Sequence, residues 1–198
     1  MTLPADIEQL IFETLNGDKS VLEFESWLYT DKQLEKTINS DDYLALISLG
    51  YKSSTAKYDL KILLEKLVDK GDYEMWRIRK LLTKALQRDK ELPQLLMNFY
   101  DLYCKGYSFF DNLGLGYGLA VEFPYSQADS WNDLTVEQQQ KLLVGFYPQL
   151  DIEIKKIINW LETGKIKLTG NRDQYNYYFD YTDNRTPEER LPTAYQRG

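Results

Sequence analysis

The chain has 198 residues, with 31 acidic and 24 basic side chains, a formal charge of −7, one cysteine and no histidine. Without histidine there is no Ser/His/Asp or Cys/His relay, and no metal or haem site built on imidazole ligands. The negative charge argues against a nucleic-acid partner, because each phosphate contact needs a cation. We therefore expect any charged partner to be a basic protein.

The N-terminus and the cysteine content indicate the compartment. Met1 to Asp6 shows no basic patch followed by an apolar stretch, and no window reaches the roughly 18 apolar residues of a membrane span. Lone Cys104 cannot form an internal disulfide, and we expect it to be a buried, inert thiol. These features predict a cytoplasmic protein that does not enter a membrane.

Apolar residues recur at helical spacing from Asp6 to Lys105, separated by short polar breaks. The first such segment stops at Asn16-Gly17, and Ser20 with Glu23 three residues later predicts a capping box at the start of the next. The run from Tyr43 to Leu49 fits a strand or a helix. We expect short helices packed in series.

The two clearest helices are predicted over Thr55–Lys70 and Asp72–Arg88, with Gly71 as the stop between them. A third helix is predicted from Leu92-Pro93 toward Gly106, since proline is tolerated in a first turn. Connections this short favour antiparallel packing.

Residues 107–135 break the helical pattern, because Gly114, Gly116 and Gly118 alternate with larger residues. We expect an extended, aromatic-rich loop region there. A phosphate-binding role is disfavoured, since no lysine follows the glycines and the chain continues to Pro124. Glycines that permit tight bends or close backbone packing are the preferred interpretation.

Helical periodicity returns at Thr135, where Gln138 occupies the third position, and again from Pro148 to Thr163. The period then changes to two. Lys165–Thr169 alternates charge and hydrophobe, residues 170–173 suit a turn, and residues 174–181 are rich in strand formers, which predicts a C-terminal hairpin. The last fifteen residues, 184–198, are predicted to form a loosely attached tail.

Together these segments predict a mainly α (α+β) fold: a bundle of about eight helices with a small C-terminal β-hairpin. We expect one globular domain over residues 1–183, helical in 1–106 and loop-rich and mixed in 107–183.

The candidate binding residues lie in the second part, where residues 107–183 carry 11 acidic and 6 basic side chains. Strand alternation from Tyr175 to Tyr181 would place the odd-numbered rings on one face, and Tyr178 and Asp180 on the other. Exposed tyrosine is a frequent interface residue, and carboxylates beside it suit a partner's lysines and arginines. The predicted partner-binding residues are Asp111, Tyr117, Glu122, Tyr125, Asp129, Trp131, Tyr178, Asp180 and Asp183. The alternative is that most of these rings pack the hairpin against the helices.

A carboxylate pair that binds magnesium or shares acid and base roles is a second hypothesis, but nothing in the acid spacing selects two residues. We therefore name no catalytic residue, metal ligand or cofactor. A carboxylate-based metal-dependent hydrolase and a helical adaptor module remain the alternatives to a non-catalytic binding protein.

Four stretches together carry a resemblance: Phe24-Glu-Ser-Trp-Leu-Tyr29, Asp42-Tyr-Leu-Ala-Leu-Ile-Ser48, Asn112–Gly118 and Trp160–Gly170. With them the chain resembles, over about residues 20–170, the small acidic bacterial immunity proteins of polymorphic or contact-dependent toxin systems. The resemblance implies a cytoplasmic protein that neutralises a cognate toxin domain, commonly a nuclease, by occluding its active site. It assigns no individual residues, because such proteins vary most where they contact their toxins. An acidic, aromatic surface suits this implication, since a nuclease groove must be basic.

Overall fold

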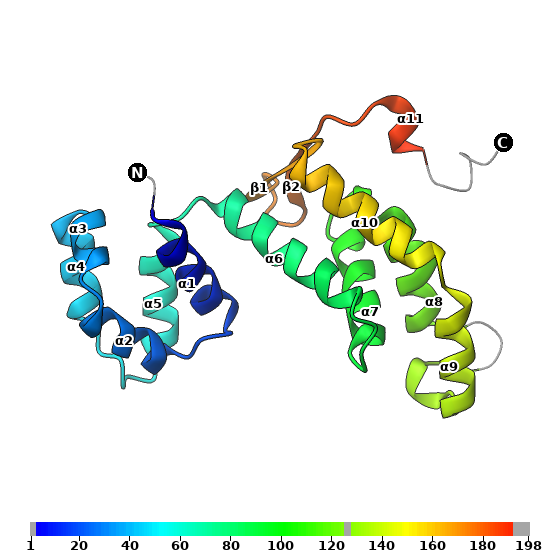
Figure 1. Ribbon diagram of the computed structural model, residues 1–198, viewed down its shortest axis with the longest axis horizontal. Helices are drawn as coiled ribbons and strands as arrows, with labels where there is room; N and C mark the ends of the chain where they lie inside the picture. The colour runs from blue at the N-terminus through cyan, green and yellow to red at the C-terminus, as the bar shows by residue number, and fades with distance from the viewer. Residues whose placement is uncertain (1–2, 125–127, 192–198) are drawn as a thin grey trace. The chain divides into compact units, whose positions relative to one another are not determined.

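The computed structural model describes residues 3–124 and 128–191. This part of the chain is built of α-helices and a two-stranded antiparallel hairpin near its end, which confirms the predicted mainly α (α+β) class (Figure 1). The chain divides into two compact units, Met1–Arg77 (unit 1) and Ile78–Gly198 (unit 2). From the sequence we expected one domain over residues 1–183 that changes character at residue 106. The division instead falls at Arg77, inside a helix.

Unit 1 is all helical within its described residues. Its elements are α1 (Ala5–Asn16), α2 (Val21–Thr30), α3 (Gln33–Thr37), α4 (Ser40–Ile47), α5 (Ala56–Glu65) and the start of α6 (Lys70–Ala85). The ambiguous run at Tyr43 is therefore helical. Two predicted boundaries are confirmed: Gly17 ends α1 with φ +83°, and Ser20 and Glu23 form the capping box of α2.

The predicted stop at Gly71 is wrong, because Gly71 lies in the first turn of α6. The carboxylate of Asp69 accepts hydrogen bonds from the N–H groups of Gly71 and Asp72, at 2.7 and 3.0 Å, and so caps this helix. The preceding helix ends earlier than predicted, at Glu65. The capping aspartate, more than the glycine, marks the boundary.

The core of unit 1 is a cluster of aliphatic and aromatic side chains contributed by successive helices. It contains Ile7 and Ile11 of α1, Phe24 and Leu28 of α2, Leu34, Leu46, and Leu60 and Leu64 of α5. Each of these side chains is at most 2% exposed. Their helical spacing in the sequence explains why these helices were recognisable.

Unit 2 combines α-helices with other element types. After the end of α6 it contains α7 (Leu92–Cys104), η1 (Ser108–Phe110), η2 (Asn112–Gly118), α8 (Leu119–Glu122), η3 (Trp131–Asp133), α9 (Val136–Gly145), α10 (Gln149–Glu162), β1 (Ile166–Arg172), β2 (Phe179–Asp183) and α11 (Pro187–Arg190). The capping box predicted at Thr135 and Gln138 is confirmed.

The glycine-rich segment is helical, which corrects the expectation of an extended loop over residues 107–135. Residues Asn112–Gly118 form a π-helix (η2), a rare element with wider turns than an α-helix. A Cβ added at Gly118 would lie 2.4 Å from the carbonyl oxygen of Leu96 in α7, and one at Gly114 would lie 2.9 Å from the Cβ of Tyr103. These two glycines therefore permit close packing of η2 on α7, as the preferred interpretation held.

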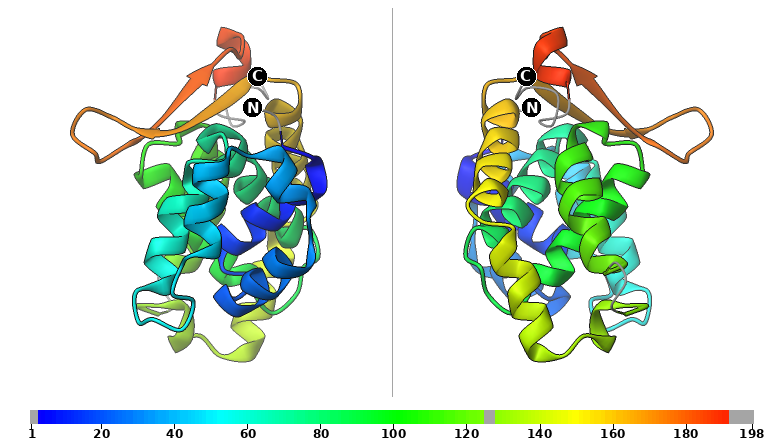
Figure 2. Two further views of the ribbon diagram at one scale, coloured as in Figure 1. Left: turned by 90° about the vertical axis from the view of Figure 1, so that its left-hand side faces the viewer. Right: turned by 90° about the vertical axis from the view of Figure 1, so that its right-hand side faces the viewer.

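The hairpin is present, but its turn lies further along the chain than predicted. Strand β1 continues through Arg172, its pairing with β2 shifts between Leu168 and Arg172, and the connecting loop spans residues 173–178. Phe179 and Tyr181 of β2 face inward, with ring centroids 4.8 and 5.8 Å from that of the fully buried Tyr107. Figure 2 shows the hairpin running out from the helices of unit 2 to the loop at its far end.

Residues 184–191 are tied to the fold, which corrects the expectation of a loosely attached tail for this part of the chain. Thr186 and Glu189 form the capping box of α11, and the Glu189 carboxylate pairs with Lys165. The Arg190 guanidinium donates to the carbonyl oxygens of Asp183 and Arg185, at 2.9 and 3.1 Å. Residues 192–198 lie outside the described residues.

Candidate functional site

The loop at the end of the hairpin presents three exposed tyrosines. Tyr175 is 79% exposed, Tyr177 63% and Tyr178 48%, and the rings of Tyr177 and Tyr178 meet edge to face at 4.7 Å. The predicted strand alternation holds from Phe179 onward and fails before it, because residues 173–178 form the loop. The aromatic run thus divides into an inner pair that packs on the core and an outer set that faces solvent.

Main-chain and side-chain hydrogen bonds hold this loop in one conformation. The Asp173 N–H donates to the carbonyl of Tyr178 at 2.8 Å, and the Asp173 carboxylate accepts the N–H of Tyr177 at 2.8 Å. Arg172 donates to the Tyr177 carbonyl at 3.1 Å, and its guanidinium carbon lies 4.3 Å from the centre of the Phe179 ring. The exposed rings are therefore carried by an ordered loop, which lowers the entropic cost of binding through them.

Two predicted acids, Asp111 and Asp183, lie near one buried arginine and do not form part of an open surface. Arg185 is 6% exposed, donates to both carboxylate oxygens of Asp183 at 3.0 and 2.9 Å, and lies 4.4 Å from the centre of the Trp160 ring. Asp111 is half-buried, and the positive charge of Arg185 acts to lower its pKa. Arg185 was missed because it follows the predicted hairpin in a segment with few hydrophobic residues.

The pKa values of Asp111 and Asp183 are shifted in opposite directions. Burial raises the pKa of Asp111, although a hydrogen bond from the Asn112 N–H and the charges of Arg185 and Lys156 oppose this. Partial burial also acts to raise the pKa of Asp183, but the hydrogen bonds from Arg185 outweigh it and hold that pKa below its ordinary value. Asp183 is therefore ionised and already paired.

A second buried charge, Glu153 of α10, lies in the same unit and is 4% exposed. Its carboxylate accepts hydrogen bonds from Asn112 and Gln149, at 3.1 and 3.0 Å, and lies 3.7 Å from the amino group of Lys156. These contacts satisfy the carboxylate and join η2 to α10. Glu153 thus has a structural explanation and needs no catalytic one.

Glu122 and Trp131 come together in a shallow hollow of about 250 Å³, beside Pro93, Gln94 and Met97 of α7. Trp131 is half-buried, and its carbonyl oxygen accepts a hydrogen bond from Gln139 at 3.0 Å. Lys90 also lines this hollow, so its charge is mixed. These two predicted residues meet each other, but no described contact links them to the hairpin loop.

The remaining predicted residues are scattered. Tyr117 is half-buried and packs edge to face on Phe146 at 5.0 Å, whereas Asp129 is exposed. Asp180 is exposed on β2, where the Thr169 hydroxyl donates to its carbonyl oxygen at 2.9 Å. Tyr125 lies outside the described residues. Of the nine predicted residues, Tyr178, Asp180 and Asp183 belong to the hairpin, and Asp183 is paired with Arg185. The exposed Tyr175 and Tyr177 of the same hairpin were not among the nine.

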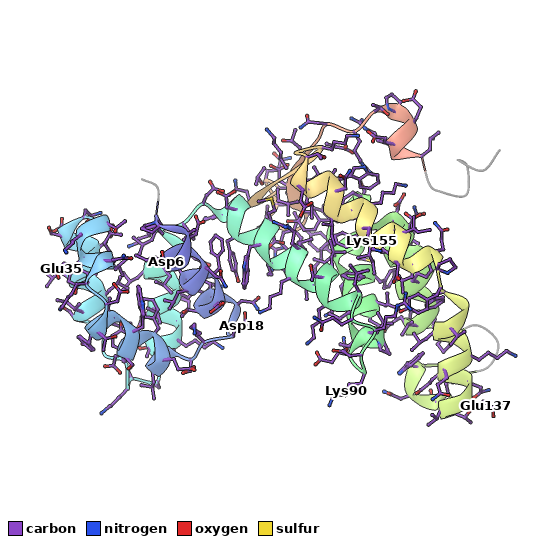
Figure 3. The ribbon with its side chains drawn as sticks, viewed as in Figure 1. Asp6, Asp18, Glu35, Lys90, Glu137 and Lys155 are labelled. Atoms are coloured by element: carbon purple, nitrogen blue, oxygen red, sulfur yellow. The ribbon has the colours of Figure 1, made fainter. Side chains whose placement is uncertain are left out.

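When charges are counted by unit, most of the net negative charge lies in unit 1 and not in unit 2. Unit 1 has 15 acidic and 9 basic residues, whereas unit 2 has 16 and 15. Exposed charges of both signs project from unit 2, such as Lys90, Glu137 and Lys155 (Figure 3). Unit 2, which carries the candidate loop, is thus close to neutral, and the acidic character expected of its surface is confined to a few exposed carboxylates.

Two observations bear on the hydrolase and adaptor alternatives, and a third concerns the cysteine. Among residues 3–124 and 128–191, no three carboxylate or thiol side chains gather where they could hold a metal ion. An apolar hollow of about 370 Å³ lies between α8 and α9, lined by Ala120, Leu142, Phe146 and their neighbours. Cys104 is exposed, which corrects the expectation of a buried thiol.

Comparison of the chain with protein-family models, with curated proteins and with solved structures finds no match. Within the described ranges, no helix combines the length and the apolar composition needed to cross a membrane.

Proposed function

We propose that this chain is a non-catalytic binding protein that grips a basic partner protein through the loop at residues 173–178. The observation that carries the proposal is the exposure of Tyr175, Tyr177 and Tyr178 on an ordered loop. Tyrosine covers a large contact area at low rotamer cost and keeps a hydroxyl for hydrogen bonding, which suits protein recognition.

The partner we propose is a cognate bacterial toxin domain with a basic, nuclease-like groove, whose active site the loop occludes. The resemblance to immunity proteins supports this identity, and Asp180 beside the rings supplies a negative charge for a lysine or arginine. The cytoplasm is the compartment in which such a partner would be met, and the exposed thiol of Cys104 suits its reducing conditions.

The first step of the test is to identify the neighbouring genes; where one encodes a large secreted protein, its C-terminal domain is the partner to use. The full-length chain should bind that domain and restore growth to cells that express it. The double change Tyr175→Ala and Tyr177→Ala should weaken binding by about 100-fold or more, as expected for two interface residues worth about 2 kcal/mol each, and abolish the rescue.

Tyr58→Ala is the matched control, because Tyr58 is 67% exposed but belongs to α5 of unit 1. It should leave both binding and rescue unchanged. Asp180→Lys should slow association, with an effect that shrinks as salt is added. Full rescue by the double variant would exclude the loop as the contact, and a lack of rescue by the unaltered chain would remove the toxin as the partner.

The adaptor alternative is favoured by one observation, the apolar hollow between α8 and α9. Helix α9 has no buried residue, and Val136 and Val144 on it are 69% and 71% exposed. An adaptor would bind an amphipathic partner helix there. Leu142→Glu, a change in a residue that lines the hollow, would then abolish partner binding while the tyrosine changes left it intact, the reverse of the result expected for the hairpin.

A further inference from the structure

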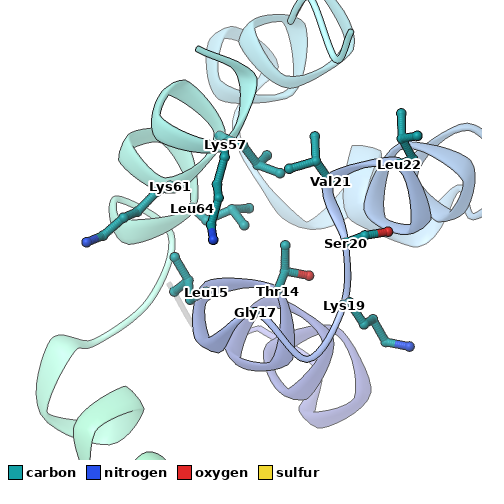
Figure 4. Close-up of a pocket in the computed structure, with 11 residues that line it drawn as sticks. Thr14, Leu15, Gly17, Lys19, Ser20, Val21, Leu22, Lys57, Lys61 and Leu64 are labelled. Atoms are coloured by element: carbon teal, nitrogen blue, oxygen red, sulfur yellow. The ribbon is translucent and has the colours of Figure 1, made fainter. Parts of the chain in front are cut away.

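Unit 1 contains a hollow of about 460 Å³ between its first, second and fifth helices. It is lined by Thr14 and Leu15 of α1, by Gly17, Lys19 and Ser20 of the connection, by Val21 and Leu22 of α2, and by Lys57, Leu60, Lys61 and Leu64 of α5. This volume falls within the range of about 300 to 1,000 Å³ that is typical of small-molecule sites. The close-up in Figure 4 shows these elements arranged around the hollow.

The wall of the hollow is apolar, and the polar groups at its edge are mostly engaged. The Thr14 hydroxyl donates to the Leu10 carbonyl at 2.8 Å, and the Ser20 hydroxyl accepts the N–H of Glu23 at 3.2 Å. Each hydroxyl therefore keeps only part of its hydrogen-bonding capacity for a ligand. A ligand must gain most of its affinity from burial of its apolar part.

Three lysines at the hollow supply the charge that selects a ligand. Lys19 lies 3.6 Å from the carboxylate of Glu13, and Lys61 lies 3.6 Å from that of Glu65. Lys57 extends from α5 toward α1 (Figure 4), and within the described residues it forms no ion pair. Three of the nine basic residues of a unit with 15 acidic ones thus line a single hollow.

We propose that this hollow binds a single-chain carboxylate amphiphile, with the alkyl chain against Leu15, Leu60 and Leu64 and the carboxylate at Lys57. An apolar body fits the wall, and an anionic head complements the lysines that line the hollow, above all Lys57, which has no described carboxylate partner. A cationic amphiphile would meet three ammonium groups. The proposal is independent of the hairpin, which belongs to the other unit.

The experiment titrates the full chain with decanoate, below the concentration at which it forms micelles, and follows leucine methyl signals by NMR. The signals of Leu15, Leu60 and Leu64 should move, and those of Leu142 at the other apolar hollow should not. Octanoate and hexanoate should bind progressively more weakly, by about fourfold for each methylene removed. Acetate, the head group alone, should not bind.

The role of the lysine charge is tested in two ways, by changing the charge of the ligand and by substituting Lys57. Decylamine, which has the same chain and the opposite charge, should bind far more weakly than decanoate. Lys57→Gln should weaken decanoate binding about two- to fivefold, the range for an exposed ion pair, and Lys57→Arg should restore it. Lys52→Gln is the matched control, because Lys52 is also exposed in unit 1 but does not line the hollow.

Three results would overturn the proposal: no shift of the unit 1 leucine methyls with decanoate, equal binding of decanoate and decylamine, or equal effects of Lys57→Gln and Lys52→Gln. Far-ultraviolet circular dichroism checks that each variant is folded. A failure to bind the toxin domain would not affect these ligand measurements. A failure to bind decanoate would likewise not affect the proposal for the hairpin loop.

Discussion

Unit 1 and unit 2 both contain buried charge, but they satisfy it over different distances along the chain. In unit 1 the buried carboxylate of Glu74 pairs with Arg77, three residues away in the same helix. In unit 2 buried Glu153 and Arg185 also have partners within four residues, but Glu153 in addition accepts a hydrogen bond from Asn112, 41 residues away, and Arg185 stacks on Trp160. The described ion pair of Glu74 in unit 1 is thus local, whereas the buried charges of unit 2 combine local partners with contacts between distant segments.

The largest effect is expected from truncating the apolar core of unit 1. Phe24 is fully buried, and its ring lies 5.5 Å from that of Trp27. Phe24→Ala should lower the free energy of unfolding by about 4 kcal/mol, because it removes buried surface and leaves a cavity. Hydrogen exchange should accelerate in α1, α2 and α5 more than in α7 and η2. Equal acceleration in both units would show that they unfold together.

The next largest effect tests the close packing in unit 2. Gly118→Ala should lower the free energy of unfolding by about 2 to 3 kcal/mol, because the new methyl group would overlap the Leu96 carbonyl in α7. Urea unfolding measures this change, and exchange should accelerate in η2 and α7.

Gly116 provides the matched control in the same π-helix, since a Cβ there would meet nothing within 4 Å. Gly116→Ala should be neutral or slightly stabilising, because alanine loses less backbone entropy than glycine on folding. Similar destabilisation by both substitutions would mean that η2 does not depend on close approach to α7.

The smallest effect concerns Asp183 and its dependence on pH. Because the folded pKa of Asp183 is lowered, its contribution to stability is fully present above the unfolded pKa of about 3.9 and is lost as pH falls through the folded value. Asp183→Asn should therefore cost about 1 kcal/mol at neutral pH, with the difference closing in acid. Thermal unfolding at several pH values measures it.

Asp180→Asn controls for a change of charge on the same strand and should have little effect, since Asp180 is exposed. Asp111→Asn should show the opposite sign, because the folded pKa of Asp111 is raised and its ionised form is disfavoured by burial. It should stabilise the protein at neutral pH and lose that advantage as pH falls. A cost for Asp111→Asn at neutral pH would mean that Arg185 and Lys156 outweigh its burial.

The helices of unit 1 were predictable because their signals are local. Ser20 and Glu23 lie within one turn of each other, and the buried residues of α1 and α5 repeat at helical spacing. The π-helix was not predictable in this way. Its glycines contact Leu96 and Tyr103 in α7, and residue order alone does not show that a neighbouring helix fills the space that a side chain would take.

The candidate site was partly predictable. The tyrosine-rich run was recognised, but the second strand was predicted to begin too early, at residue 174, because Asn176 was not read as a loop residue. Asn176 has φ +57°, which asparagine tolerates better than most residues. Asp111 and Asp183 were chosen as exposed acids, yet both lie by Arg185. Arg185, which pairs with Asp183, lies outside the segment that was expected to be ordered.

The hydrogen bonds of the loop at residues 173–178 come from its own main chain together with Arg172 and Asp173, and none of those described involves the side chain of Tyr175 or Tyr177. Natural variation could therefore replace these two side chains at little cost to folding. If the loop binds a partner as proposed, lineages of this protein could change that partner through a few codons while the scaffold beneath stayed constant.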